Sequence, residues 1–159
     1  MRMLLLPLLL VLPACSPQAA ERAPAPAMAQ AAVHPESGLE VIPLTIVSLG
    51  KTHRFRVEVA RTPEEQAQGL MFRTAMGPNE GMLFPYDPPR VLSFWMKNTV
   101  LSLDLVFIGP DKRVINVAAN AVPYSEASIV SDAPAIATLE LNAGRAAELG
   151  IVAGARVDW

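Results

Sequence analysis

The sequence predicts an α+β fold that is mostly antiparallel β, a compact barrel-like sheet with two short helices. Three observations support this prediction. Alternating and β-branched segments recur through residues 39–159, turn residues separate them, and only two stretches carry helix signals. Both stretches are too short to serve as the crossovers that a parallel sheet needs.

The first elements are a hairpin and a helix. Val41–Val47 and His53–Val59 are alternating strands, and Ser48–Lys51 is the turn that joins them. Thr62–Glu65 is a capping box with proline at the first helical position, so a short helix is expected to end at Gly69.

The middle of the chain predicts three more strands. Gly81–Phe84 is a short apolar run that ends at Pro85, and a rigid turn at Asp87–Pro89 precedes a strand over Val91–Lys97. Leu103–Ile108 is apolar throughout, which is typical of a strand buried on both faces.

The last third of the sequence predicts strands around a second helix. A turn at Gly109–Lys112 leads into a strand over Arg113–Val122, and another strand covers Ile136–Leu141. Asn142 is positioned to cap a helix over Gly144–Leu149, which Gly150 would end, and a terminal strand over Ala155–Trp159 follows.

The N-terminus predicts export. Arg2 precedes the apolar run Leu4–Leu12, which is far shorter than the roughly 20 residues of a membrane-spanning helix, so residues 1–14 are expected to be a cleaved signal peptide. Leu-Pro-Ala before Cys15 resembles a bacterial lipoprotein lipobox, and this resemblance implies a lipidated Cys15, with Ser16 favouring the outer membrane. An ordinary signal peptide with an incidental thiol is the alternative.

The mature chain then divides into a tether and a domain. Residues 15–38 are expected to be the anchor cysteine and a disordered Ala/Pro-rich linker, because they lack the apolar pattern of a core. Residues 39–159 form the single globular domain. We therefore expect a periplasmic protein whose first partner is the membrane.

Composition excludes several function classes. Thirteen basic residues against fifteen acidic ones give a net charge of −2, so nucleic acid is not an expected partner. One cysteine and two histidines do not form a zinc site of the usual type, and no sequence motif indicates a cofactor.

Three segments and their spacing resemble the DUF192 family, a domain of unknown function. They are Gly69–Arg73, Gly81–Phe84 and Phe94–Thr99, the last followed by Leu103-Asp104; the resemblance extends from Glu58 to Trp159 and includes Leu139–Gly144. It implies a small β-rich domain that is often exported, and it supplies no reaction.

A candidate ligand shelf lies in the third segment. Strand alternation would place Phe94 and Met96 on one face and Trp95 and Lys97 on the other. An aromatic wall, a cation and the polar groups of Asn98 and Thr99 would then form one patch. The structural alternative is that Trp95 covers the core while Lys97 pairs with a carboxylate.

Two charged residues complete the candidate ligand-binding set. Asp104 interrupts an apolar strand, so it needs hydrogen-bond donors or a cation. We expect it to accept the backbone N–H groups of the Asn98–Thr99 turn, the alternative being a general acid or base. Arg73 would assist in binding an anion near the shelf.

Three functions follow from these residues. The first is a non-enzymatic binding module for a small polar or anionic ligand or an envelope partner, favoured because no nucleophile–base pair is present. The second is a hydrolase that pairs Asp104 with Glu80 or Glu140. The third is Cu(I) binding by Met71, Met82 and Met96, for which core packing is the alternative.

Overall fold

A long hairpin begins the sheet. In the computed structural model, which describes residues 32–159, β2 (Glu40–Ser48) and β3 (Lys51–Val59) form an uninterrupted antiparallel ladder. Leu49 and Gly50 connect them with φ angles of 48° and 74°, as expected in a tight turn whose twist matches that of the strands. The predicted hairpin is confirmed.

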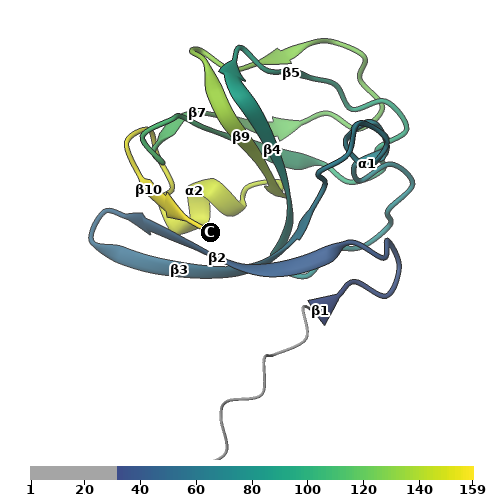
Figure 1. Ribbon diagram of the computed structural model, residues 1–159, viewed down its shortest axis with the longest axis horizontal. Coiled ribbons are helices and arrows are strands. Elements are labelled where there is room, and N and C mark those ends of the chain that lie inside the picture. Colours follow the sequence, from purple (N-terminus) through teal and green to yellow (C-terminus); the bar gives the residue numbers. More distant parts are fainter. Residues whose placement is uncertain (1–31) are drawn as a thin grey trace, which may run out of the picture. The chain divides into compact units, whose positions relative to one another are not determined.

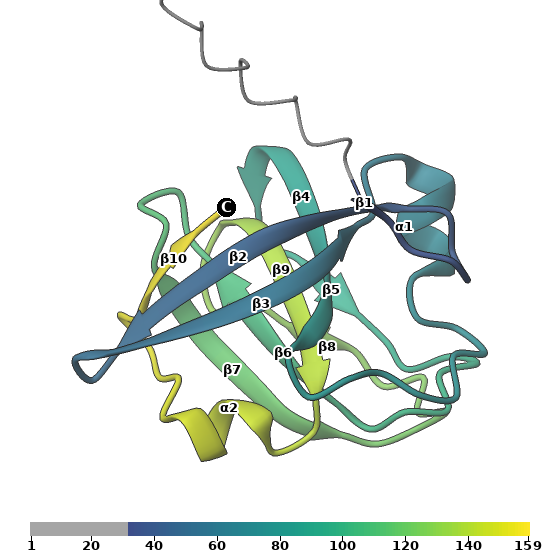
Figure 2. The same ribbon diagram turned by 90° about the horizontal axis from the view of Figure 1, so that it is seen from below.

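The strands form one large sheet and one small one. The remaining elements are β1 (Ala32–Val33), α1 (Pro63–Gln68), β4 (Glu80–Arg90), β5 (Ser93–Phe94), β6 (Leu103–Ile108), β7 (Val114–Ala121), β8 (Ile129–Val130), β9 (Ala135–Asn142), α2 (Arg145–Leu149) and β10 (Arg156–Asp158). The large sheet has the order β1-β2-β3-β4-β9-β6-β7, and β10 pairs with β2 (Figures 1 and 2). The small sheet is β5-β8.

The sheet is mostly antiparallel and open. Only β3 and β4 pair in parallel, and the two helices are short, as predicted. The β7 and β10 ends contact each other through an isolated bridge between Arg113 and Arg156 and through loop hydrogen bonds such as that from the Val114 N–H to the Ala155 carbonyl at 2.8 Å. No strand ladder closes the described sheet. The barrel-like closure that we expected is therefore not supported.

The central strands are buried on both faces. Leu83, Val106 and Leu139 belong to one apolar cluster, which the β2–β3 hairpin and α2 cover. Met82, Phe84, Leu105 and others belong to a second cluster on the opposite face, towards α1 (Figure 1). Every residue of β6 is buried, which confirms the expectation for Leu103–Ile108.

The helix ends follow the sequence signals in part. Thr62 and Glu65 form the predicted capping box, and Gly150 ends α2 in the left-handed conformation. Asn142 does not cap α2, because its side chain instead donates to the backbone carbonyls of Met76 and Gly77, both at 3.0 Å.

Two strand boundaries differ from the prediction. β4 continues through Pro85 and the Asp87–Pro89 segment, because its ladder with β9 shifts register between Pro85 and Arg90 and so leaves room for residues without a backbone N–H. The predicted strand over 91–97 shrinks to Ser93–Phe94, since the N–H of Met96 already donates to the Ser125 carbonyl of another loop.

The folded part begins before the expected boundary. Residues 32–38, which we assigned to the linker, form β1 and a turn, and β1 pairs with the first residues of β2. The predicted signal peptide and Cys15 lie outside the described residues. No helix within residues 32–159 is long and apolar enough to span a membrane.

Candidate functional site

A cleft of about 170 Å³ opens on the face of β9 that carries the second apolar cluster. Its lining comes from α1 and the loop after it, from β4, from the segment around β5, and from β9. The residues are Gln66–Met71, Phe84, Tyr86, Ser93–Trp95, Thr99 and Glu140. We call it the Glu140 cleft, and it joins parts of each of the three segments that carry the family resemblance and part of the Leu139–Gly144 stretch.

Glu140 forms a buried, uncompensated carboxyl in this cleft. Strand pairing places it opposite Met82 of β4 and Leu105 of β6, both fully buried, and Glu140 is itself only 5% exposed. Burial raises the pKa of Glu140 to about 8, with no opposing charge or hydrogen bond among the described residues. A carboxyl that keeps its proton at neutral pH inside a cleft is typical of a functional site.

Aromatic rings form the walls around this carboxyl. The ring of Phe94 makes edge-on contacts with Phe84 and Tyr86, with centroid distances of 5.3 and 6.4 Å. Burial is the main cause that raises the pKa of the Tyr86 phenol; Arg90 opposes the rise and Glu140 adds to it. Tyr86 therefore stays a neutral hydrogen-bonding group close to Glu140.

The predicted shelf lies at the rim of the Glu140 cleft. Trp95 is 49% exposed and Lys97 places its Nζ 5.0 Å from the centroid of the Trp95 ring. Thr99 lines the cleft and is buried, with its hydroxyl donating to the Lys97 carbonyl at 3.2 Å. Asn98 contacts the cleft indirectly, because its side-chain amide lies 3.9 Å from the sulfur of Met71.

Three strained loop residues surround this rim. Phe72, Asn98 and Tyr124 have φ angles of 63°, 53° and 60°, which are unfavourable for residues with side chains. The N–H of Phe72 donates to the Asn98 carbonyl at 2.9 Å, and that of Tyr124 donates to the Thr99 carbonyl at 3.2 Å. These contacts hold the loops that carry Met71 and Thr99 beside the cleft.

Arg73 lies outside the Glu140 cleft and is already neutralised. Its guanidinium binds both carboxylate oxygens of Glu58 at 2.9 and 3.0 Å, and its Nε lies 3.3 Å from Glu36. The hydrogen bond with Glu58 is the main cause that raises the pKa of Arg73. Ser37 also donates to Glu58, so the N-terminal turn completes this buried ion pair.

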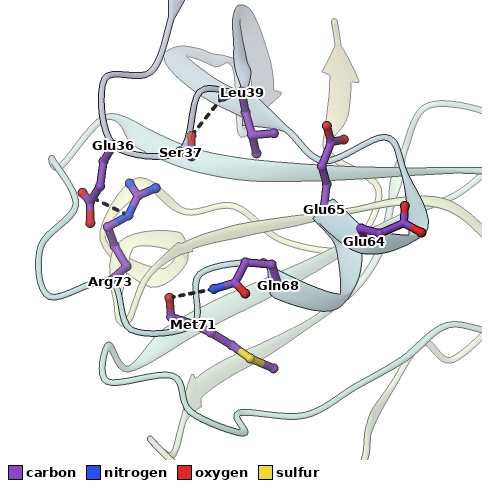
Figure 3. A pocket seen from close by; sticks show the side chains of 9 residues that line it. Glu36, Ser37, Leu39, Glu64, Glu65, Gln68, Met71 and Arg73 are labelled. Atoms are coloured by element: carbon purple, nitrogen blue, oxygen red, sulfur yellow. Dashed lines mark hydrogen bonds and ion pairs between the residues drawn. The ribbon is translucent and has the colours of Figure 1, made fainter.

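A larger cavity of about 460 Å³ borders Arg73 (Figure 3). It shares Gln68, Gly69 and Met71 with the Glu140 cleft, and Figure 3 shows the Arg73 guanidinium turned towards Glu36. Because Glu58 and Glu36 already pair with the Arg73 charge, this cavity attracts an anion less strongly than we expected from the sequence.

Asp104 has a structural environment. It is fully buried and accepts backbone hydrogen bonds from Asn120, Gly144 and Ala146 at 2.9, 3.0 and 2.9 Å. The donors are backbone amides, as expected, but they come from β7 and the start of α2 rather than from the Asn98–Thr99 turn. Asp104 thereby supplies the cap that α2 lacks in its own sequence.

The carboxylate pair of the hydrolase hypothesis is not formed. Asp104 lies opposite Leu141 in the β6–β9 ladder, so it and Glu140 point to opposite faces of the sheet. Glu80, the first residue of β4, accepts the N–H of Gly77 at 2.8 Å and does not line the Glu140 cleft.

The methionines of the copper hypothesis are divided. Met82 and Met96 are fully buried in the second apolar cluster, where they pack as core residues, and Met71 lies at the surface of the Glu140 cleft. The described part of the chain also contains no group of three or more His, Cys, Asp or Glu side chains suited to a metal ion.

Trp95, Lys97 and Thr99, which the sequence placed in one patch, lie near one another, whereas Tyr86 was not among the expected site residues and Glu140 was named only as a possible catalytic partner of Asp104. A signal for Glu140 was present, because a carboxylate within Leu139–Leu141 interrupts an apolar strand just as Asp104 does.

Comparisons with known proteins agree on the fold and leave the activity open. The DUF192 family model, described as "Uncharacterized ACR", matches residues 45–159. A protein of unknown function from Novosphingobium aromaticivorans DSM 12444 is 52% identical with a TM-score of 0.80, covering 83% of this chain and 94% of its own. A protein of Sinorhizobium meliloti 1021, described as a candidate transcription regulator, is 41% identical with a TM-score of 0.74, covering 76% and 94%. No curated protein matches the chain.

Proposed function

The chain belongs to the DUF192 family, and we propose that it is a non-enzymatic binding module for a small polar or anionic ligand. The family description names no activity. The regulator description applies to the Sinorhizobium protein, and a net charge of −2 gives this chain little attraction for a nucleic-acid backbone.

The buried Glu140 carboxyl is the observation that carries the proposal. Burying a polar group without a partner costs free energy, so such a group is retained where a ligand supplies the missing hydrogen bond. The half-exposed Trp95 ring at the same opening supplies an apolar surface for the rest of the ligand.

The cellular setting is part of the same proposal. A lipoprotein-type signal peptide and an acylated Cys15 would hold the domain in the periplasm, on the outer membrane, with the Ala/Pro-rich segment as its tether. The partners would then be the membrane, through the anchor, and a small ligand or an envelope protein.

The test of binding uses Trp95 as its own probe. In a Trp159→Phe background Trp95 is the single tryptophan, so its fluorescence reports on small carboxylates, amides, amines and sugars added one at a time. We expect at least one class to change the emission and to raise the melting temperature.

A matched pair of variants makes this test specific. Trp95→Ala should abolish the ligand-dependent rise in melting temperature, whereas Leu49→Ala, which removes an exposed apolar side chain at the β2–β3 turn outside the cleft lining, should retain it. If no compound class shifts the melting temperature, or if both variants respond as the parent does, the binding proposal is wrong.

A further inference from the structure

Two cations of the protein already occupy the aromatic rings at the mouth of the Glu140 cleft. Lys97 lies 5.0 Å from the Trp95 ring centroid, and the guanidinium carbon of Arg90 lies 4.4 Å from that of Tyr86. Both rings line the cleft. A cationic ligand would have to compete with these charges for the rings and would be repelled by them, whereas an anion would be attracted.

The lining of the cleft offers hydrogen-bond donors. Glu140 and Tyr86 are the titratable side chains of the lining. Burial keeps the Glu140 carboxyl protonated at neutral pH, and the Tyr86 phenol, whose pKa burial raises further, is protonated there as well. α1 and the loop after it contribute only uncharged side chains, among them Gln66 and Gln68, and the β5 segment contributes Ser93. Lys97 and Arg90, which lie on the rings of Trp95 and Tyr86, are the cations next to this lining.

The volume of the cleft and the chemistry of its walls restrict the class of ligand further. A volume of about 170 Å³ is below the roughly 300–1,000 Å³ of pockets for drug-sized compounds. The side chains of Leu70, Phe84 and Phe94 form apolar walls beside the carboxyl. A suitable ligand has one acceptor group and a short apolar body.

We propose that the ligand is a small organic carboxylate whose oxygens accept a hydrogen bond from the Glu140 carboxylic acid, while its apolar part packs against Trp95 and Phe94. This inference rests on the proposed binding function and adds the ligand class to it. The proton stays on Glu140 throughout, so binding needs no chemical step and no co-reactant.

The pH dependence of binding distinguishes a carboxylate from other ligands. Above a pH of about 8 Glu140 loses its proton, and two carboxylates would then face each other in an apolar cleft. The affinity for a carboxylate should be constant between pH 6 and 7 and should fall about tenfold per pH unit above 8. A ligand amine would show the opposite slope.

The experiment titrates propionate, butyrate and benzoate, with propionamide and propylamine as matched neutral and cationic probes, into the Trp159→Phe protein at pH 6–9. Trp95 fluorescence is the readout. We expect the carboxylates to bind and the amide and amine to bind at least tenfold more weakly at pH 6.

Three variants test which side chains are responsible for the carboxylate affinity and for its pH dependence. Glu140→Gln keeps an N–H donor but cannot ionise, so its carboxylate affinity should become independent of pH. Lys97→Met should weaken carboxylate binding several-fold and leave propionamide binding unchanged. Lys51→Gln, at the distant β2–β3 turn, is the charge-matched control and should behave as the parent.

The outcomes separate the two proposals. Tighter binding of propylamine, equal binding of propionate and propionamide, or a pH profile that survives in Glu140→Gln would overturn the carboxylate assignment while leaving a binding module. Absence of binding by every probe, together with no response in the wider compound screen, would remove the binding function itself.

Discussion

The unpaired Glu140 carboxyl predicts a specific pH dependence of stability. Its pKa is about 8 in the folded protein and 4.5 in an unperturbed glutamate. Between these two values the folded chain holds a proton that the unfolded chain has released, so the unfolding free energy falls by about 1.4 kcal/mol per pH unit. Below pH 4.5 the group contributes no penalty, and above 8 the penalty is complete, at roughly 5 kcal/mol.

The Glu140→Gln variant isolates this contribution because glutamine does not titrate. From pH 5 to pH 8 we expect the unfolding free energy of the parent to fall relative to that of Glu140→Gln. Above pH 8 the difference between the two proteins should stay constant. Urea unfolding followed by circular dichroism at five pH values measures this difference.

Glu126→Gln, at an exposed loop position, is the matched control and should give a flat difference near zero. A difference for Glu140→Gln that stays constant from pH 5 to pH 9 would refute the reasoning, because it would mean that Glu140 titrates equally in the folded and unfolded chains.

Three further predictions concern stability at pH 7, each measured by urea unfolding. Arg73→Met leaves the Glu58 carboxylate buried without its cation and should cost about 3–5 kcal/mol; a loss below 1 kcal/mol would contradict a tight pair. Asp104→Asn replaces an accepting oxygen by an N–H group and should cost about 3 kcal/mol, which a neutral result would disprove. Thr62→Ala removes half of the capping box and should cost about 1 kcal/mol, and an unchanged midpoint would show that the cap carries no stability.

The parts of the fold that the sequence predicted are those determined by near neighbours. The hairpin of β2 and β3 follows from alternation on either side of a short turn, and the start of α1 follows from four consecutive residues at Thr62–Glu65. Leu103–Ile108 was recognisable because burial on both faces removes polar residues from the strand itself.

The predictions failed where contacts between residues far apart in the sequence determine the structure. The parallel pairing of β3 with β4 joins strands separated by α1 and a long loop, and no local pattern indicates it. Asn142 has the residue type of a helix cap, yet the loop at Met76–Gly77 offers it two carbonyls, and Asp104 takes over the capping of α2.

Asp104 and Glu140 show why the site was harder to predict than the fold. Both are carboxylates within apolar strands, and the sequence alone assigns them the same cost of burial. The β6–β9 register offsets them by one position, so they face opposite sides of the sheet. On one side the backbone amides of Asn120, Gly144 and Ala146 satisfy Asp104; on the other, no described group donates a hydrogen bond to Glu140, which faces the cleft. Whether a buried carboxylate stabilises the fold or is left free to bind a ligand depends on its hydrogen-bond donors, and those donors come from elements far apart in the sequence.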